Sequence, residues 1–177
     1  LRAIERGIPV VSGTTGWTDR QPELRARCEA GEGTVFWSSN FSIGVNLFLQ
    51  INRRVAALMQ VAPNYHLSMD ETHHIHKLDA PSGTAITLAE AILSERPELT
   101  GWELTEELHT GLLPITAHRE GEVPGIHTVT YTSEVDRIVL THEAFGRQGF
   151  ALGAVLAAEF AHTHQGWLTM DDMLQLG

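Results

Sequence analysis

The chain has 177 residues, 42% of them hydrophobic and 19% charged, which is enough to bury a core in one domain or two small ones. Its formal net charge of −10 argues against general nucleic-acid binding, and no stretch approaches the ~20 apolar residues that span a bilayer. The single cysteine, Cys28, excludes an intrachain disulfide and a zinc site of several thiolates, and the lack of a signal-peptide pattern makes a cytoplasmic location the expectation.

The first forty residues have the pattern of one strand–helix–strand unit. Ile8–Ser12 is a short apolar, β-branched run closed by a glycine, as in buried parallel strands. Thr18 or Asp19 can cap a following helix that carries Pro22 in its first turn. Val35–Ser38 is a second short strand. This order predicts a parallel sheet with a right-handed crossover.

The middle of the chain alternates between helix and strand patterns. Ile43–Val61 has helical apolar spacing, and a proline stops it. Tyr65–Met69 alternates between apolar and polar residues, as a half-buried strand does. Thr84–Arg96 is an amphipathic helix that Ser82 and Gly83 introduce.

The last third has the pattern of strands and then a helix. Within Leu113–Phe145, the segments Ile126–Ser133 and Arg137–His142 suggest a hairpin with a short loop. Gly149–His162 is Ala-rich and helical, with Gly166 at its end, and the tail can add a short helix. The elements together predict an α/β (α+β) fold: the end of a nucleotide-binding domain of Rossmann type, and a mixed sheet with flanking helices.

Chemically informative residues gather in Glu71–Ala85, which is written ETHHIHKLDAPSGTA. Of the twelve basic residues only Lys77 is a lysine, and three histidines lie beside it. Gly83 opens a helix whose exposed N–H groups favour an anion. The combination predicts an anion site with proton donors, which suits a small dicarboxylate and acid–base chemistry.

Simpler interpretations remain open for each part of this segment. His74 or His76 alone is more often structural, and PSGT alone is an ordinary helix cap. The HHIH run is also compatible with a metal site, but adjacent histidines on a strand point to opposite faces and the lysine ammonium opposes a cation. We therefore expect no metal.

The segment Glu71–Ala85 resembles the signature of dihydrodipicolinate reductases, which act on 4-hydroxy-tetrahydrodipicolinate in the diaminopimelate and lysine pathway. Four further blocks resemble this family in order and spacing, so that the resemblance covers essentially the whole chain. The blocks are VVSGTTGW (Val10–Trp17), SSNFSIGVN (Ser38–Asn46), EGEVPGIHT (Glu120–Thr128) and FGRQGFALGAV (Phe145–Val155).

The resemblance implies a role for each matching residue of the site. His73 matches the acid/base histidine and Lys77 a proton donor. His74 matches a substrate contact, and Gly83 and Thr84 match backbone contacts to a substrate carboxylate. The reaction implied is hydride addition to C4 of the ring, after loss of the 4-hydroxyl as water, to give tetrahydrodipicolinate.

The resemblance also implies NADPH or NADH as cofactor. The matching cofactor residues are two loops and two later positions: Gly13, Thr14 and Thr15; Ser38, Ser39, Asn40 and Phe41; and Arg147 and Phe150. By the residues alone, GTTG is simply a tight turn and SSNF a helix cap. Only their register with the other blocks favours a cofactor role.

The family pattern divides the chain into three parts: residues 1–40, a partial dinucleotide-binding domain; 41–147, a substrate-binding domain that assembles a homotetramer; and 148–177, a helical segment returning to the first domain. No G-x-G-x-x-G precedes GTTGW, so we expect a fragment that does not reduce substrate alone. Ile75 stands where many relatives carry Arg. Two alternatives are a non-catalytic oligomerisation module and a His-rich metal-binding protein.

Overall fold

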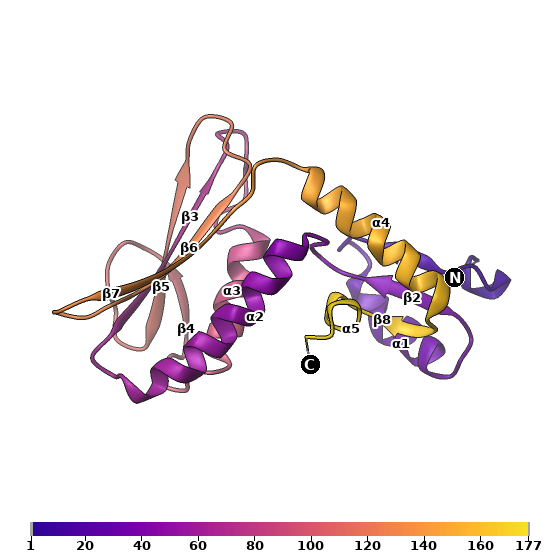
Figure 1. Ribbon diagram of the computed structural model, residues 1–177, viewed down its shortest axis with the longest axis horizontal. Helices are drawn as coiled ribbons and strands as arrows, with labels where there is room; N and C mark the ends of the chain where they lie inside the picture. The colour runs from indigo at the N-terminus through magenta and orange to yellow at the C-terminus, as the bar shows by residue number, and fades with distance from the viewer. Residues whose placement is uncertain (1, 177) are drawn as a thin grey trace. The chain divides into compact units, whose positions relative to one another are not determined.

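The computed structural model describes residues 2–176 and divides into two units (Figure 1). One unit contains the residues up to Asn46 and those from Gln148 on, and the other is Leu47–Arg147. The strands are β1 (Val10–Ser12), β2 (Thr34–Trp37), β3 (His66–His73), β4 (Gly101–Leu104), β5 (Leu112–Arg119), β6 (Ile126–Thr132), β7 (Arg137–Glu143) and β8 (Gly166–Leu168). The helices are α1 (Gln21–Glu29), α2 (Ile43–Leu58), α3 (Gly83–Leu93), α4 (Gln148–Thr163) and α5 (Met170–Leu174). None of these helices is long and apolar enough to cross a bilayer.

The first unit is built on a parallel sheet of order β1-β2-β8. Val10 pairs with Val35 across β1 and β2, with α1 between these strands in the sequence, so the predicted strand–helix–strand unit is confirmed. Phe36 is fully buried and packs with Phe41 and with Ala157 of α4. The small residues of α4 therefore let the helix lie close to the sheet.

The end of the C-terminal helix differs from the prediction. Gly166 was expected to end that helix, but α4 ends at Thr163 and Gly166 begins β8, paired with Thr34 of β2. The positive φ of 104° at Gly166 turns the chain back onto the sheet, which a residue without a side chain does at little cost. A strand of three residues is too short to show a sequence period.

The second unit is a five-stranded mixed sheet of order β4-β5-β3-β6-β7. The central strand β3 is parallel to β5 and antiparallel to β6, and the predicted hairpin of β6 and β7 is confirmed. Two helices, α2 and α3, cover one face of this sheet (Figure 1). Met69 of β3, Leu88 and Ile92 of α3 and Val129 of β6 are fully buried in the core between them.

Two strands of this sheet differ from the prediction: one is longer than expected and one was not expected. The strand expected at Tyr65–Met69 continues to His73, because every second residue stays buried even after the side chains become polar. β4 was not predicted, since Gly101–Leu104 is only half-buried and carries no alternation. It pairs in parallel with β5.

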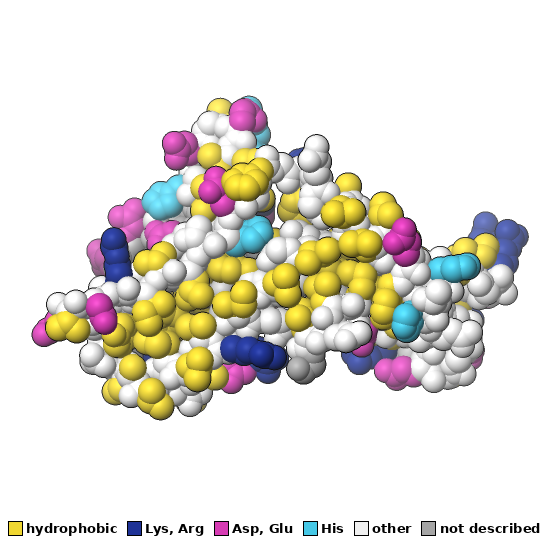
Figure 2. Space-filling model, in the orientation of Figure 1, with side chains coloured by type: hydrophobic (Ala, Val, Ile, Leu, Met, Phe, Trp, Pro, Cys, Tyr) yellow, Lys and Arg dark blue, Asp and Glu magenta, His cyan; other side chains and the backbone are white. Residues whose placement is uncertain are grey.

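Helix α3 begins where the sequence indicates. The Ser82 hydroxyl accepts a hydrogen bond from the Ala85 amide, as an N-cap does. The helix was predicted to continue to Arg96 but ends at Leu93, because a residue that precedes proline, as Arg96 does, is disfavoured in helical conformation. Helix α2 ends at Leu58 and continues as a tighter turn to Val61. Hydrophobic side chains gather on the surface over α2 (Figure 2). The exposed apolar residues of this helix include Leu47, Ile51 and Leu58.

Candidate active site

The candidate site is built on the carboxyl end of β3. Alternation places Leu67, Met69, Glu71 and His73 on the buried face of the strand. The first two are ordinary core side chains, whereas the last two bring polar groups into the same interior. Burying a carboxylate is costly unless hydrogen bonds and opposite charge compensate it, so the surroundings of Glu71 define the site.

Glu71 is fully buried, and its carboxylate accepts hydrogen bonds from a backbone amide and from a guanidinium. Both of its carboxylate oxygens accept the Ser82 amide, at 3.1 and 3.0 Å, and Oε1 also accepts Arg119 Nη2 at 3.2 Å. Because Ser82 is the N-cap of α3 and Arg119 ends β5, this one carboxylate joins three elements.

His73 lies next to this carboxylate. Its Nδ1 is 3.6 Å from Glu71 Oε2 and forms no hydrogen bond within residues 2–176. On its other side, a Cβ built on Gly125 would be 3.1 Å from His73 Nε2, so the backbone at Gly125 holds the ring closely. Burial lowers the pKa of His73, against the opposing effect of Glu71, and Lys77 lowers it further.

His127 of β6 completes the buried group. Its ring centroid is 5.1 Å from that of His73, and its Nε2 lies 3.2 Å from Ser82 Oγ. Since this hydroxyl already accepts the Ala85 amide, its own proton is available to His127. Burial, reinforced by His73, lowers the pKa of His127 to about 4, so the ring is neutral at pH 7.

The loop between β3 and α3 carries Lys77. The Lys77 ammonium contacts both carboxylate oxygens of Asp79, at 2.8 and 2.9 Å, and this hydrogen bond lowers the pKa of Asp79. Arg119 holds the loop backbone, because its Nε donates to the Lys77 carbonyl at 3.3 Å and its Nη2 to the Asp79 carbonyl at 2.6 Å. Arg119 thus holds the backbone of Lys77, and Asp79 pairs with its ammonium group.

The predicted anion site at the start of α3 lies at the end of the same loop. Gly83 is exposed and Thr84 half-exposed in the first turn, and a Cβ on Gly83 would meet nothing within 4 Å. The positive end of this eleven-residue helix attracts a carboxylate. Segment 71–85 thus brings His73, Lys77 and a helix N-terminus into one region of the second unit.

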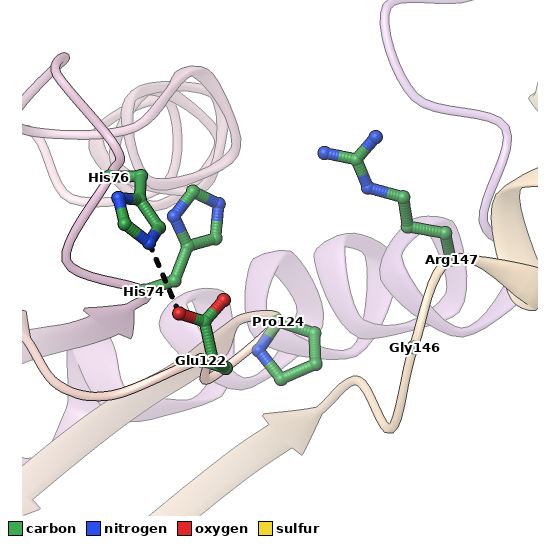
Figure 3. A pocket seen from close by; sticks show the side chains of 6 residues that line it. All are labelled: His74, His76, Glu122, Pro124, Gly146 and Arg147. Atoms are coloured by element: carbon green, nitrogen blue, oxygen red, sulfur yellow. Dashed lines mark hydrogen bonds and ion pairs between the residues drawn. The ribbon is translucent and has the colours of Figure 1, made fainter.

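A pocket of about 390 Å³ opens beside this segment. Its lining residues are His74, His76, Glu122, Pro124, Gly146 and Arg147 (Figure 3). His76 Nε2 lies 3.1 Å from Glu122 Oε1, and the His74 and His76 rings are 6.0 Å apart. The volume suits a small molecule, and the lining combines the Arg147 guanidinium and two imidazoles with the Glu122 carboxylate.

The two predicted cofactor loops meet in the first unit. They follow β1 and β2, so both lie at the carboxyl edge of a parallel sheet, where such sheets bind ligands. The Ser38 amide donates to the Ser12 carbonyl, and a Cβ on Gly13 would be 3.2 Å from the Phe41 ring. The loop residues Gly13, Thr14, Thr15 and Ser39 are exposed, Asn40 is half-buried and Ser38 is buried. Phe150 is exposed on α4, in the same unit.

A metal-binding geometry occurs at residues other than those weighed from the sequence. Ligand atoms of Glu71, His73 and His127 lie within 4.8 Å of one another, whereas His74 and His76 line the pocket instead. The Glu71 oxygens already accept two donors, and the Arg119 guanidinium beside them opposes a cation. This group is therefore better suited to hydrogen bonding than to metal binding.

Three residues of the site had no role in the sequence interpretation: Glu71, Arg119 and His127. Glu71 and His127 lie within matched blocks, and Arg119 directly precedes one. For Glu71 the available signal was a polar residue at a buried position of the alternating strand β3, whereas Arg119 and His127 lie on β5 and β6. This signal becomes visible only once the extent of the strand is known.

Comparison with known proteins gives a consistent group of relatives. Residues 44–174 match the family model described as the C-terminus of dihydrodipicolinate reductase. A 4-hydroxy-tetrahydrodipicolinate reductase of Christiangramia forsetii is 49% identical over 96% of this chain and 71% of its own length. One from Archaeoglobus fulgidus is 38% identical over 98% of this chain and 69% of its own length.

A solved structure has a similar fold. It is a dipicolinate-bound dihydrodipicolinate reductase from Paenisporosarcina, 25% identical, with a TM-score of 0.75. The match covers 96% of this chain and 66% of that one. The chain thus spans about two thirds of the length of the relatives that it matches.

Proposed function

Because this chain belongs to the dihydrodipicolinate reductase family of lysine biosynthesis, we propose that it forms the substrate site for reduction of 4-hydroxy-tetrahydrodipicolinate to tetrahydrodipicolinate. The observation that carries the proposal is one loop that presents Lys77 and the start of α3 beside the buried His73. Binding a dicarboxylate and transferring a proton to it require positive groups and proton donors at the same place.

The substrate carboxylates have two complementary partners in this segment. One is the Lys77 ammonium, where a substrate carboxylate would replace Asp79, and the other is the first turn of α3 at Gly83 and Thr84. His74, in the wall of the adjacent pocket, would add a hydrogen bond. The dipicolinate bound in the Paenisporosarcina enzyme is a dicarboxylate of this kind.

Proton transfer falls to Lys77 and His73. The Lys77 ammonium carries a proton that it can donate to the ring as C4 is reduced. His73, with its lowered pKa, is mainly neutral at pH 7 and can relay a proton without holding a permanent charge. Its Nδ1 lies 3.6 Å from Glu71 Oε2, whose charge raises the pKa of the ring. Once the 4-hydroxyl has left as water, one hydride at C4 and one proton on the ring complete the reduction.

The cofactor part of the proposal concerns the first unit. NADPH or NADH supplies the hydride when it is bound. The exposed turn at Gly13–Thr15 and the loop Ser38–Phe41 suit the nicotinamide end, because both lie at the carboxyl edge of the parallel sheet. Arg147 and Phe150 are further cofactor residues in this proposal.

Assembly into a homotetramer in the cytoplasm belongs to the same proposal. Helices α2 and α3 cover one face of the second unit's sheet, and the opposite face carries half-buried and exposed β-branched residues, among them Thr130, Val139 and Thr141. A face of this kind suits a sheet of another copy. Sedimentation of the wild-type chain and of Val139→Glu would test it: tetramers that lose mass on substitution are expected, and a monomeric wild type contradicts it.

The substrate proposal is tested by calorimetric titration with dipicolinate. The chain is expected to bind it, and Lys77→Met should lose at least about tenfold in affinity, because one charge-assisted contact disappears. Arg25→Met, which removes an exposed ion pair with Glu29, is the matched control and should bind like the wild type. Equal affinity in Lys77→Met would contradict the assignment.

Turnover separates an enzyme from a binding module. NADPH oxidation is measured with freshly prepared substrate, for the chain and for Lys77→Met. The expectation from the sequence is that the chain alone shows no turnover. Turnover that the chain shows and Lys77→Met loses would overturn that expectation and support catalysis by this site. Tetramers that bind neither dipicolinate nor NADPH would instead favour the non-catalytic assembly module.

A further inference from the structure

The loop that carries Lys77 is held at two places by one ion pair of the interior. In its middle, Arg119 donates to the carbonyls of Lys77 and Asp79. At its end, Glu71 accepts the Ser82 amide, one residue before the first turn of α3. Glu71 and Arg119 meet at 3.2 Å, with the Glu71 side chain fully buried and that of Arg119 22% exposed.

Filling the core does not require a charge at this position. Leu67 and Met69 fill the same face of β3 without any polar group, and an apolar residue at position 71 would avoid the cost of desolvating a carboxylate. The carboxylate is instead matched to donors from two different elements, the cap of α3 and the end of β5. Its geometry is therefore specific to the loop between β3 and α3.

We propose that Glu71 and Arg119 are positioning residues: their ion pair sets the distance between the Lys77 ammonium and the N-terminus of α3, so that the two carboxylates of one substrate are held together. This inference rests on the proposed function. It adds that neither residue contacts substrate, and that the spacing of the two anion partners comes from the interior of the sheet.

The same carboxylate acts on His73. Glu71 lies 3.6 Å from His73 Nδ1, and it raises the pKa of the ring while Lys77 and Arg119 lower it. The remaining neighbours are Asp79, which raises this pKa, and His127, whose ring is 5.1 Å away. Removing the charge of Glu71 should therefore lower the titration midpoint of His73, an effect that a merely structural side chain would not have.

The test combines dipicolinate titration with NMR titration of the histidine rings. Glu71→Gln keeps an oxygen for the Ser82 amide but loses the ion pair with Arg119. We expect at least about tenfold weaker dipicolinate binding and a lower His73 midpoint. Glu29→Gln, which breaks the exposed pair with Arg25, is the control and should change neither quantity.

A second variant covers the case in which Glu71→Gln does not fold. Arg119→Lys keeps the positive charge near Glu71, but a single ammonium cannot reach both loop carbonyls and the carboxylate as the planar guanidinium does. It should weaken dipicolinate binding while the chain stays folded. Wild-type affinity in folded Arg119→Lys, or an unchanged His73 midpoint and affinity in folded Glu71→Gln, would overturn the positioning role.

Failure of the substrate proposal gives a different result. If the wild-type chain does not bind dipicolinate, the substrate assignment fails. The positioning role is then decided by the NMR data alone: a lower His73 midpoint and faster exchange of the Ser82 amide in Glu71→Gln support it, and unchanged values reject it.

Discussion

The two halves of the buried face of β3 have opposite chemistry. Leu67 and Met69, in the first half, pack against α2, α3 and the neighbouring strands as a dry core. Glu71 and His73, in the second half, meet an amide, a guanidinium and a second imidazole. The backbone, the sheet and the direction of the side chains are shared, so only the side-chain chemistry separates the two halves.

The difference separates stability from chemistry within one strand. Apolar burial gains free energy in proportion to the area removed from water, and requires no particular partner. A buried carboxylate gains little or nothing overall, and depends on each donor around it. We therefore expect substitutions in the first half to change unfolding, and those in the second to change ligand binding and pH dependence.

The largest expected effect belongs to the apolar half. Met69→Ala removes a fully buried side chain and should lower the free energy of unfolding by about 2–5 kcal/mol. Urea unfolding measures it. Ser68→Ala, on the opposite face of β3, is the control and should stay within about 0.5 kcal/mol of the wild type. An equal loss of unfolding free energy in both variants would contradict the assignment of Met69 to the buried face and Ser68 to the opposite face.

The second effect is a pH dependence that belongs to the polar half. His127 has a pKa of about 4 when folded, below the value of an unfolded histidine, so the unfolded state binds more protons as pH falls. The contribution of His127 to the free energy of unfolding is therefore fully present above about pH 6.5 and decreases below it. Between pH 7 and pH 5 the free energy of unfolding should fall by about 2 kcal/mol. Urea unfolding at both pH values tests it. His127→Gln should flatten the loss, and an unchanged slope in this variant contradicts the assignment.

A third effect concerns the ring of His73. Gly125→Ala places a Cβ 3.1 Å from His73 Nε2 at a backbone φ of 157°, so the ring must give way and the backbone is strained as well. Dipicolinate affinity should fall by about tenfold if the site depends on this geometry. Gly111→Ala, at a φ of 79° where the new Cβ meets only ordinary contacts at 3.7 Å, carries backbone strain without touching His73 and serves as control. Calorimetry that finds both variants equal to the wild type would make His73 irrelevant to binding.

The smallest effect concerns Ser82, the N-cap of α3, whose amide is bound by Glu71 of the polar half. Ser82→Ala removes the N-cap oxygen that accepts the Ala85 amide, and should cost about 1 kcal/mol of stability. Thermal unfolding measures it. Thr87→Ala, which removes a hydroxyl bonded to the Gly83 carbonyl inside the same helix, should cost less. A larger loss in Thr87→Ala would argue against a capping role for Ser82.

Sequence patterns predicted the elements with a long period and a clear boundary. The helix Ile43–Val61, the helix opened by Ser82 and the hairpin of β6 and β7 follow from periodicity and capping, which are local. β4 and β8 were missed, because three or four residues carry no period and their strand character comes from pairing with β5 and β2. The end of β3 was predicted too early for another reason: its buried residues Glu71 and His73 are polar, and a polar run is typical of a loop.

The sequence by itself determined the segment 71–85, the family to which it belongs, and the residue types available for anion binding and proton transfer. These follow from the order of residues, since a motif is a local property. Only the tertiary structure decided that Arg119 and His127, some fifty residues away, surround Glu71. Sheet pairing sets which distant side chains share an interior, and the charge and burial of a group depend on those neighbours.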